Sequence, residues 1–501
     1  MITSALPVPA IARAYIDAAP PGDWFLFDMS PLDVTGIPAW KAAFFPEDPA
    51  AVGCEVQQGT GYGQTPEQAM IAAVAECHEE VHARLGFARM QQVQGSYDAL
   101  VAARGSAGVV DPLLLCLPAG SPVGRDTPLS WVEARRWFGG EPVLVPVDVA
   151  ALSGDHLPKG YTPFTTLITN GLGAGPTLEW AASHGLFECL QRDGNGLRLR
   201  ALDSRIALTF DDALPSEVAA SARRIADAGI DLLPKFATDE FGIANVFVVG
   251  ADRDPSRLAV PIALSGCGEA ADPDRVKALR KAMLEYAHAR ARKAFAFGPI
   301  DTVRRVVPPG YWERVEPRAR RAARHTEPRQ VEAFRHWLDL DGGQLRVLLA
   351  DPVFTVAAEK PFADLPTAAV STPEATGADA AGRLRAAGLD PLILDFTPPN
   401  AAMHAVRVVV PGLEVETMSY YRIGERNAAK LLAAGSDLVR RGEASDTRRP
   451  IRLSPAAEDR LGGPLLLDIE KVDARVGALY PLYREPGAHE MAFHRAGSEG
   501  G

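Results

Sequence analysis

The sequence predicts an α+β fold in which a Gly-rich loop and a helix recur as one unit, packed on mixed sheets. Residues 59–80 match 171–192, within the stretch 169–193, without a gap when they are shifted by 112 positions. A fainter third copy begins its helix at Asp274, after a shift of 209 positions. Apolar runs that are typical of buried strands separate the copies, and they lie at 141–149, 242–252 and 258–268.

The first two copies place the same residue types at the same positions. Gly61 falls on Gly173, and Glu76 falls on Glu188. Each helix begins after a threonine, which can cap the free N–H groups of the first turn. The preceding glycines allow the backbone to approach a ligand closely, and a helix start favours an anion such as phosphate. An ordinary turn is the alternative interpretation of the same glycines.

The helix of each copy has an apolar face and a carboxylate face. Residues four positions apart form the core stripe, which is Ala69, Ala73, Cys77, Val81 and Leu85 in the first copy and Ala181, Gly185 and Cys189 in the second. Glu76 and Glu79 lie away from this stripe, and Glu188 and Gln191 take their places in the second copy. A solvated acidic face with a Glu188–Arg192 pair explains a single helix of this kind. Two converging faces instead favour Mg²⁺, held by carboxylates and substrate phosphates.

The rest of the chain is predicted in outline. Residues 1–50 are rich in proline and aromatic residues and are expected to be irregular. A long helix is expected at about 274–295, and the basic run 318–324 is expected to be a solvated helix face or a docking site for an acidic leader peptide or partner. Residues 371–382 are expected to form a polar connector, and 388–414 to form two strands around a Pro-rich turn.

Length, charge and cysteine use restrict the class of protein. The chain has 501 residues, which is too long for one simple core. Its formal net charge is -11, so we expect it not to bind nucleic acid. Five cysteines without a C-x-x-C pair suit a reducing cytoplasm, and the N-terminus lacks a signal-peptide pattern. The longest apolar runs are too short to span a bilayer, so we expect no membrane association.

The pentapeptide HEEVH matches the short zinc-peptidase signature. In that interpretation His78 and His82 bind zinc, and Glu79 is the general base. The further histidine of a metzincin is missing, since none occurs between His82 and His156. At about 100° per residue, the two histidines also point away from the face of Glu76. We expect them to be flanking or surface residues, with a zinc metallopeptidase as the minor alternative.

Four separate pieces of the sequence resemble the YcaO family of ATP-dependent enzymes, which activate backbone amides of peptides. Three helix motifs and a late segment follow one another in the family's order over roughly residues 55–430. The matching positions are Ala72, Glu76, Glu79 and Glu80, then Asn170, Gly171, Gly175, Glu179, Glu188, Gln191, Arg192 and Asp193, then Glu285, His288, Arg290 and Arg292, and finally Asp395, Thr397 and Val408–Glu414. The resemblance implies a YcaO-like fold with a catalytic domain at 51–430. Residues 1–50 and 431–501 are then extensions, and the last residues are expected to be disordered.

The resemblance also implies roles for individual residues. It implies catalytic roles for Glu188, Arg192, His288 and Arg290, ATP contacts for Asn170, Glu179, Gln191, Ala72 and Arg292, and Mg²⁺ contacts for Glu76, Glu79, Glu188 and Gln191. ATP and Mg²⁺ are the implied cofactors. Phosphoryl transfer to an amide oxygen makes phosphate the leaving group, and a thioamide or an azoline then forms.

Several positions depart from the family pattern. Ala72 replaces a serine, Glu80 an arginine, Gln191 a glutamate and His288 a glutamine. Because Gln191 is neutral, the metal site loses one charge, and a catalytically degenerate scaffold is the alternative to an active enzyme. The chain also lacks the Pro-rich tail typical of azoline-forming members, which favours thioamide formation. A peptide or protein substrate and a leader-binding or TfuA-type partner protein are implied, and the possibility of a homodimer is left open.

Overall fold

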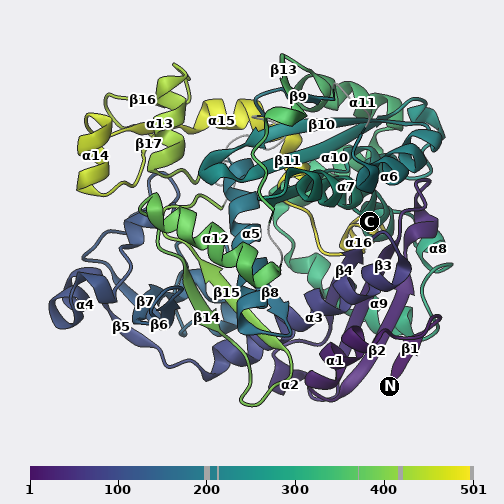
Figure 1. Cartoon of the computed structure of the whole chain (residues 1–501), viewed down its shortest axis with the longest axis horizontal. Coiled ribbons are helices and arrows are strands. Elements are labelled where there is room, and N and C mark those ends of the chain that lie inside the picture. Colours follow the sequence, from purple (N-terminus) through teal and green to yellow (C-terminus); the bar gives the residue numbers. More distant parts are fainter. Residues whose placement is uncertain (197–202, 211–213, 370–371, 416–420, 497–501) are drawn as a thin grey trace. The chain divides into compact units, whose positions relative to one another are not determined.

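The computed structural model describes residues 1–196, 203–210, 214–369, 372–415 and 421–496, coloured along the chain in Figure 1. The chain divides into two compact units. Unit 1 comprises Met1–His78, Arg200–Ala369 and Ala478–Gly501, and unit 2 comprises Glu79–Leu199 and Val370–Gly477. The division falls inside helix α3 (Pro66–Arg89), so the domain predicted at 51–430 contributes to both units. The disorder expected at the extreme C-terminus lies outside the described residues.

Unit 1 begins with a four-stranded sheet, which corrects the irregular segment expected at 1–50. Its strands, in spatial order, are β1 (Ile2–Ser4), β2 (Gly22–Asp28), β3 (Ala39–Pro46) and β4 (Gln57–Tyr62), and its short helices are α1 (Ala10–Ala18) and α2 (Pro49–Val52). β1 and β2 are parallel, and the other neighbours are antiparallel. The aromatic residues fill strand positions here, and all eight residues of β3 are buried, as in a strand covered on both faces.

The second sheet of unit 1 carries the long helix that the sequence predicts. Its strand order is β12–β11–β10–β9–β13, with β9 (Ile206–Thr209), β10 (Ile230–Thr238), β11 (Ala244–Asp252), β12 (Gly268–Asp272) and β13 (Ala358–Pro361). Helix α7 (Arg275–Phe297) packs on β11 and β12 and contacts α6 (Ser216–Asp227) (Figure 1). The strand predicted at 258–268 is wrong, because Pro261 begins a short 3-10 helix and the chain becomes extended only at Gly268. Proline cannot donate to a strand ladder.

The helices after α7 complete unit 1. They are α8 (Ile300–Val303), α9 (Tyr311–Ala322), α10 (Pro328–Asp339), α11 (Gly342–Leu349) and, later in the chain, α16 (Glu490–Ala496). Tyr311 of α9 packs on β2, with its ring 6.3 Å from that of Phe25 and 5.0 Å from that of Phe27. Trp337 of α10 is fully buried, and its indole N–H donates to the Ala478 carbonyl at 2.9 Å. The basic run predicted as a helix face begins on α9.

Unit 2 is built on a six-stranded antiparallel sheet. The strand order is β5–β6–β14–β15–β8, and β7 also pairs with β6, with β5 (Val93–Ser96), β6 (Pro128–Arg136), β7 (Pro142–Pro146), β8 (Leu172–Gly175), β14 (Leu392–Asp395) and β15 (His404–Val409). β14 and β15 are the two strands predicted around the Pro-rich turn. Helices α4 (Tyr97–Arg104) and α5 (Leu178–Gly196) follow β5 and β8, respectively. Ala83 and Phe87 of α3 lie in the core of this unit.

The connector predicted at 371–382 contains the start of a helix, α12 (Pro373–Ala386), which packs on α5. The hydroxyl group of Thr372 accepts a hydrogen bond from the N–H of Ala375 at 3.2 Å and caps the helix. Pro373 occupies the first helical position, where its missing N–H has no consequence. The expectation failed because low hydrophobicity was read as a loop, although alanine is the strongest helix former.

The C-terminal part of unit 2 forms a small three-stranded sheet with three helices. The strand order is β16–β18–β17, with β16 (Val439–Arg440), β17 (Arg448–Pro450) and β18 (Leu466–Asp468), and the helices are α13 (Glu425–Ala433), α14 (Pro455–Leu461) and α15 (Ile469–Val476). The extension predicted at 431–501 therefore contributes to both units. Among the described residues, every helix is too short or too polar to cross a bilayer.

Candidate functional site

The glycines of the repeated units lie in or beside strands, which corrects the predicted loops. Gly61 belongs to β4, Gly173 to β8 and Gly268 to β12. A Cβ atom on Gly61 would clash with the backbone of α3 at Ala69 and Ala73. A Cβ atom on Gly173 or Gly268 would clash in the same way with α5 or α7. The glycines therefore allow each strand to pack directly on the helix that follows it.

The helix starts are capped in all three copies, as the sequence predicts. The hydroxyl oxygen of Thr65 accepts from the N–H of Gln68 at 3.3 Å, at the start of α3. That of Thr177 accepts from the N–H of Trp180 at 3.1 Å, at the start of α5. In the third copy, the carboxylate of Asp274 caps α7 by accepting from two N–H groups of its first turn. Each copy thus consists of a strand, a cap and a helix.

A glutamate in each of these helices accepts a hydrogen bond from the backbone N–H of a residue in or beside the strand of its own copy. The pairs are Glu76 with Thr60, Glu188 with Gly171 at 2.9 Å, and Glu285 with Glu269 at 2.8 Å. The first and third pairs are both separated by 16 residues, which confirms the fainter third copy. Each hydrogen bond therefore fixes the orientation of its carboxyl group.

In unit 1, Glu76 and His288 both lie near a cationic group that consists of Lys41 and Arg292. Burial raises the pKa of Glu76, and the charges of Lys41 and Arg292 offset this effect only in part. His288 is 6% exposed, and its ring lies 5.4 Å from that of Tyr62. Burial, reinforced by the charges of Arg292 and Lys41, lowers the pKa of His288 to about 3. His288 is therefore neutral at pH 7, and its Nε2 has no hydrogen-bond partner among the described residues.

Arg292 is fixed by a carboxylate from the last part of unit 1. Its Nη1 lies 2.5 Å from Oε2 of Glu485, and Lys293 pairs with the other oxygen of the same carboxylate. Burial opposes the ionisation of Glu485, but the charges of Arg292 and Lys293 outweigh it and hold its pKa well below the usual range. An ionised Glu485 therefore orients two neighbouring cations of α7.

Arg290, for which the resemblance implies a catalytic role, is fully buried between two aspartates. Its Nε donates to Asp33 at 3.0 Å, and its two terminal nitrogens donate to Asp252 at 2.8 and 3.0 Å. Nη1 also lies 3.4 Å from the hydroxyl group of Tyr286. Every nitrogen of the guanidinium has a partner, so Arg290 fixes α7 to β11 and to the loop that carries Asp33.

Unit 2 places two of the predicted metal ligands beside β8. Glu79 accepts from the N–H of Ala174 at 3.0 Å, and Glu188 accepts from the N–H of Gly171. Ala174 lies in β8, and Gly171 lies in the turn just before it. Arg192 lies 3.7 Å from Glu188, which is the ion pair that the sequence predicts.

Three further predicted ATP contacts lie on the β8–α5 unit, but they are not gathered at one point. Asn170 precedes β8, and its side-chain amide donates to the Val415 carbonyl at 2.8 Å. Gln191 is half-buried, three residues after Glu188. Glu179 is exposed in the first turn of α5 and has no hydrogen bond or ion pair among the described residues. It precedes Glu188 by about 13 Å along the helix axis.

The described residues contain no preformed metal centre, since no three His, Cys, Asp or Glu side chains gather in them. Mg²⁺ commonly takes one or two carboxylates together with substrate phosphates. Glutamates that are held singly by strand backbones therefore still fit this ion. Ala72 lies one turn before Glu76 on α3 and brings only a methyl group, where a serine would offer a hydroxyl group.

The histidines of the HEEVH sequence are buried, which corrects the expectation that they flank the helix or lie at the surface. His78 is 0% exposed and His82 is 1% exposed. Nδ1 of His78 lies 3.2 Å from the carbonyl oxygen of Tyr15, and the two rings are 5.0 Å apart. The expectation failed because α3 is covered on more than one side, whereas a single apolar stripe suggests one buried face.

Lys41 and Glu485 were not found from the sequence, although both act on the predicted residues. Lys41 is 6% exposed, and its ammonium group lies 5.7 Å from the ring of Phe295. A signal for Lys41 is visible in retrospect, because a lysine in the apolar run AWKAAFFP must be buried with the strand. Glu485 has no comparable signal, because its partners are distant in sequence.

Two solved structures show the same fold. A heterocyclase in complex with substrate and cofactor has a TM-score of 0.54 and 17% identity, over 82% of this chain and 52% of that chain. The chain thus spans about half the length of that heterocyclase. YcaO from Methanopyrus kandleri, bound with AMPPCP and Mg²⁺, has a TM-score of 0.53 and 20% identity, over 82% of this chain and 91% of that chain. The predicted α+β, YcaO-like fold is confirmed.

Two relatives match the sequence over most of its length. An uncharacterized protein of Methanothermobacter thermautotrophicus is 26% identical over 403 residues, which are 80% of this chain and 91% of the relative. An uncharacterized protein in the tfuA 3′ region of Rhizobium leguminosarum bv. trifolii is 27% identical over 424 residues, which are 81% of this chain and 88% of the relative.

A family model described as YcaO cyclodehydratase, ATP- and Mg²⁺-binding, matches residues 60–414. This span contains the helices of all three copies and every residue for which the resemblance implies a role. ATP and Mg²⁺ are the cofactors of this family, as the resemblance implies, so that prediction is confirmed. The chain belongs to the YcaO family.

Proposed function

We propose that this chain activates backbone amides of a peptide or protein by ATP- and Mg²⁺-dependent phosphorylation of the amide oxygen. The observation that carries the proposal is the set of glutamates fixed by strand backbones. Glu188 and Glu79 are each oriented by one backbone N–H beside β8. Oriented oxygen ligands of this kind suit Mg²⁺ that is completed by substrate phosphates.

The carboxylates Glu76, Glu79 and Glu188 are assigned to Mg²⁺, together with the amide oxygen of Gln191. Glutamine offers a carbonyl oxygen without charge, so this set attracts Mg²⁺ less strongly than four carboxylates would. Glu179 is too exposed to be fixed before a ligand binds. We assign it an outer contact with the nucleotide.

The cationic residues are assigned to the phosphates. Arg192 and Arg292 have charges that can neutralise the phosphoryl group as it is transferred. His288 is neutral, and its unpartnered Nε2 suits a hydrogen bond to the nucleotide or to the peptide. Arg290 has every nitrogen engaged, so we assign it a positioning role through α7.

ATP supplies the phosphoryl group that turns the amide oxygen, a poor leaving group, into phosphate. The protein must then hold the amide and the phosphate in line and keep water out. Asn170 is fixed through its donated hydrogen bond to Val415, which leaves its side-chain carbonyl for a ligand. A sulfur donor or a neighbouring Cys, Ser or Thr side chain of the peptide then displaces phosphate, giving a thioamide or an azoline.

We favour the thioamide product. The relative in the tfuA 3′ region supports a TfuA-type partner protein for this chain as well. The cytoplasm remains the proposed compartment, because none of the five cysteines is in a disulfide, which is typical of a reducing environment.

A degenerate, non-catalytic partner is the second candidate function, and two residues favour it. Ala72 and Gln191 each remove a polar or charged group that the family pattern contains. A scaffold of this kind would retain the fold and partner binding but would turn over no ATP.

The test separates charge from structure at Glu188. Glu188→Gln keeps an acceptor for the N–H of Gly171 but removes the charge, whereas Glu188→Ala removes both. We expect calorimetric titration with ATP and Mg²⁺ to show one site in the wild type, and both variants to weaken it at least about tenfold. Only Glu188→Ala should also lower the melting temperature. Wild-type protein that binds no nucleotide, with partner and candidate peptide present, would reject the proposal.

A further inference from the structure

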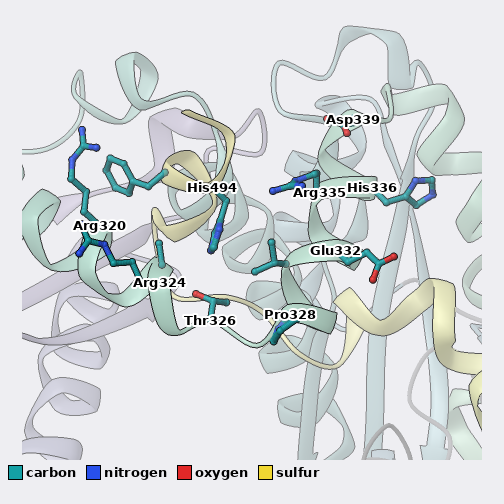
Figure 2. Close-up of a pocket in the computed structure, with 12 residues that line it drawn as sticks. Arg320, Arg324, Thr326, Pro328, Glu332, Arg335, His336, Asp339 and His494 are labelled. Atoms are coloured by element: carbon teal, nitrogen blue, oxygen red, sulfur yellow. The ribbon is translucent and has the colours of Figure 1, made fainter. Parts of the chain in front are cut away.

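A cavity lies in unit 1, outside the residues assigned to ATP and Mg²⁺. It is an open groove of about 790 Å³, lined by residues of α9, α10 and α16 and of the turn that joins α9 to α10. Arg320 and Arg324 line one side together with His494, and Arg335 lies across from them (Figure 2). The groove contains the end of the basic run that the sequence singles out.

The arginines of this groove are available to a ligand. Arg324 and Arg335 are exposed, and neither side chain has a hydrogen bond or ion pair among the described residues. Arg320 pairs with Glu316, and its guanidinium lies 4.2 Å from the ring centroid of Phe493. This cation–π contact holds the guanidinium against the groove wall. An unpaired guanidinium presents a fork of donors that matches a carboxylate.

The directions of the side chains concentrate positive charge in the centre of the groove. In Figure 2 the side chain of Arg335 points toward His494, whereas those of Glu332 and His336 point away from it. Burial and the charge of Arg335 lower the pKa of His494, and Glu490 opposes this change. Since His494 is neutral at pH 7, Arg335 supplies the positive charge at the centre of the groove, although the chain as a whole has a net charge of -11.

Apolar groups lie between these charges. Phe493, Val331, Pro328 and Ala323 all line the groove. A ligand with alternating acidic and apolar groups would thus meet a complementary surface. An extended peptide can present both kinds of group, because its successive side chains point to opposite sides and can reach both walls of a groove.

We propose that the groove between α9 and α10 docks an acidic, extended segment of the peptide that the enzyme modifies. This inference rests on the proposed function for the identity of the partner, but its physical basis is the groove alone. Arg324 and Arg335 bind carboxylates of the segment, and Phe493 and Val331 contact its apolar side chains. Docking raises the concentration of the amide at the enzyme, so it lowers KM and leaves kcat unchanged.

A peptide fits the groove better than the other anions do. A nucleic acid carries a continuous line of phosphates, which Glu332 and Asp339 in the lining would repel, as would the negative charge of the chain. A single phosphate ion would fill only a small part of the volume and would leave the apolar lining exposed. Separate carboxylates can contact the arginines and avoid the two acidic residues.

The test is a direct binding measurement on the full chain. The probe is a short fluorescein-labelled peptide in which Asp or Glu alternates with Leu and Gly, and fluorescence anisotropy reports its binding. We expect binding that weakens with salt, and a loss of roughly tenfold or more in affinity for Arg324→Glu/Arg335→Glu. The same double variant should gain affinity for a matched peptide in which Lys replaces each acidic residue.

Arg223→Glu is the matched control, because Arg223 is exposed on α6 and lies outside the groove. It should bind the acidic peptide as the wild type does. If the charge reversal in Arg324→Glu/Arg335→Glu unfolds the chain, Arg324→Gln/Arg335→Gln is used in its place. This neutral double variant should also weaken binding of the acidic peptide. Equal binding by the wild type and the double variants overturns the proposal, and so does displacement of the peptide by single-stranded RNA at lower concentration than by unlabelled peptide. The anisotropy measurement contains no ATP. A failure of peptide docking is therefore distinguished from a failure of ATP binding, which calorimetry measures separately.

Discussion

The carboxylate of Glu285 lies 2.8 Å from the backbone nitrogen of Glu269, in the relationship that Glu76 has with Thr60. Glu285 has no predicted role in ATP or metal binding. Its hydrogen bond therefore indicates that the glutamate joins strand to helix in every copy, whatever its further role. Glu76 and Glu188 add metal binding to this shared structural contact under the proposed function.

We predict that Glu285→Gln leaves ATP binding unchanged. Glutamine keeps an acceptor for the N–H of Glu269, so the free energy of unfolding should fall by only about 1 kcal/mol. Thermal unfolding and calorimetric titration with ATP and Mg²⁺ measure the two quantities. A loss of ATP binding as large as that of Glu188→Gln would mean that the third copy also takes part in the site.

Gly61→Ala is expected to be strongly destabilising. The added methyl group would meet the backbone of α3 at Ala69 and Ala73, which cannot move without separating strand from helix. We expect a loss of about 3 kcal/mol or more in the free energy of unfolding. Gly382→Ala is the control, because its Cβ would meet no atom within 4 Å in α12. It should be neutral or stabilise by up to about 1 kcal/mol. Equal melting temperatures for the two variants would contradict the packing argument.

Restoring the charge at Gln191 should change the Mg²⁺ dependence of the enzyme. One charge beside a bound ion is worth about 1 to 3 kcal/mol. Gln191→Glu should therefore either lower the Mg²⁺ concentration needed for half-maximal ATP turnover or reduce turnover by binding the metal too tightly. The measurement is ATP turnover against Mg²⁺ concentration, with partner and candidate peptide present. Two flat curves at zero activity, with partner binding intact, would favour the scaffold.

His489 should make unit 1 sensitive to acid. It is 0% exposed, and burial, with the charge of Lys41, lowers its pKa from 6.5 to about 3. Below pH 6.5, His489 of the unfolded chain binds a proton, whereas His489 of the folded chain stays neutral. The contribution of this histidine to the free energy of unfolding is therefore fully present above pH 6.5 and is lost as the pH decreases. At pH 5 the loss is about 2 kcal/mol. His489→Gln should reduce the difference in unfolding free energy between pH 7 and pH 5 by this amount, and an unchanged difference would contradict the assignment.

Lys41→Met should weaken ATP binding. Methionine fills the buried position but removes the positive charge next to Glu76 and His288. We expect the Kd for ATP to rise about tenfold or more, with folding retained. Lys159→Met is the control, since Lys159 is an exposed lysine of unit 2. Equal ATP affinity in both variants would show that the charge of Lys41 does not contribute to ATP binding.

The helices and their internal repeats could be predicted because helix signals are local. A helix cap, such as Thr65 or Asp274, and a glutamate at a fixed distance along the sequence from that cap recur in the chain. Helix α7 lies where this pattern predicts it. The apolar stripe through Ala69, Ala73 and Cys77 is buried as predicted. These features depend on residues within a few turns of one another, which is the range over which sequence periodicity carries information.

Features that depend on distant partners could not be predicted in the same way. The glycines were read as loops because their reason, close contact with a helix, appears only when strand and helix pack. His78 was expected near the surface, but Tyr15 lies against it from 63 residues earlier. Arg290 was assigned to catalysis from its motif, while its partners Asp33 and Asp252 lie outside any motif. Contacts between residues that are distant in the chain are therefore what the motifs do not predict.

The pairing of Arg292 with Glu485 also has a consequence for synthesis on the ribosome. The two residues are 193 positions apart, so Arg292 leaves the ribosome well before its partner does. During that interval Arg292 and Lys293 lack the carboxylate that orients them. Domains tend to fold as units during translation, yet unit 1 combines the first residues of the chain with residues after 477. The cationic group beside Glu76 is therefore complete only at a late stage of translation, and a nascent chain that stops before Glu485 should not yet bind ATP at full strength.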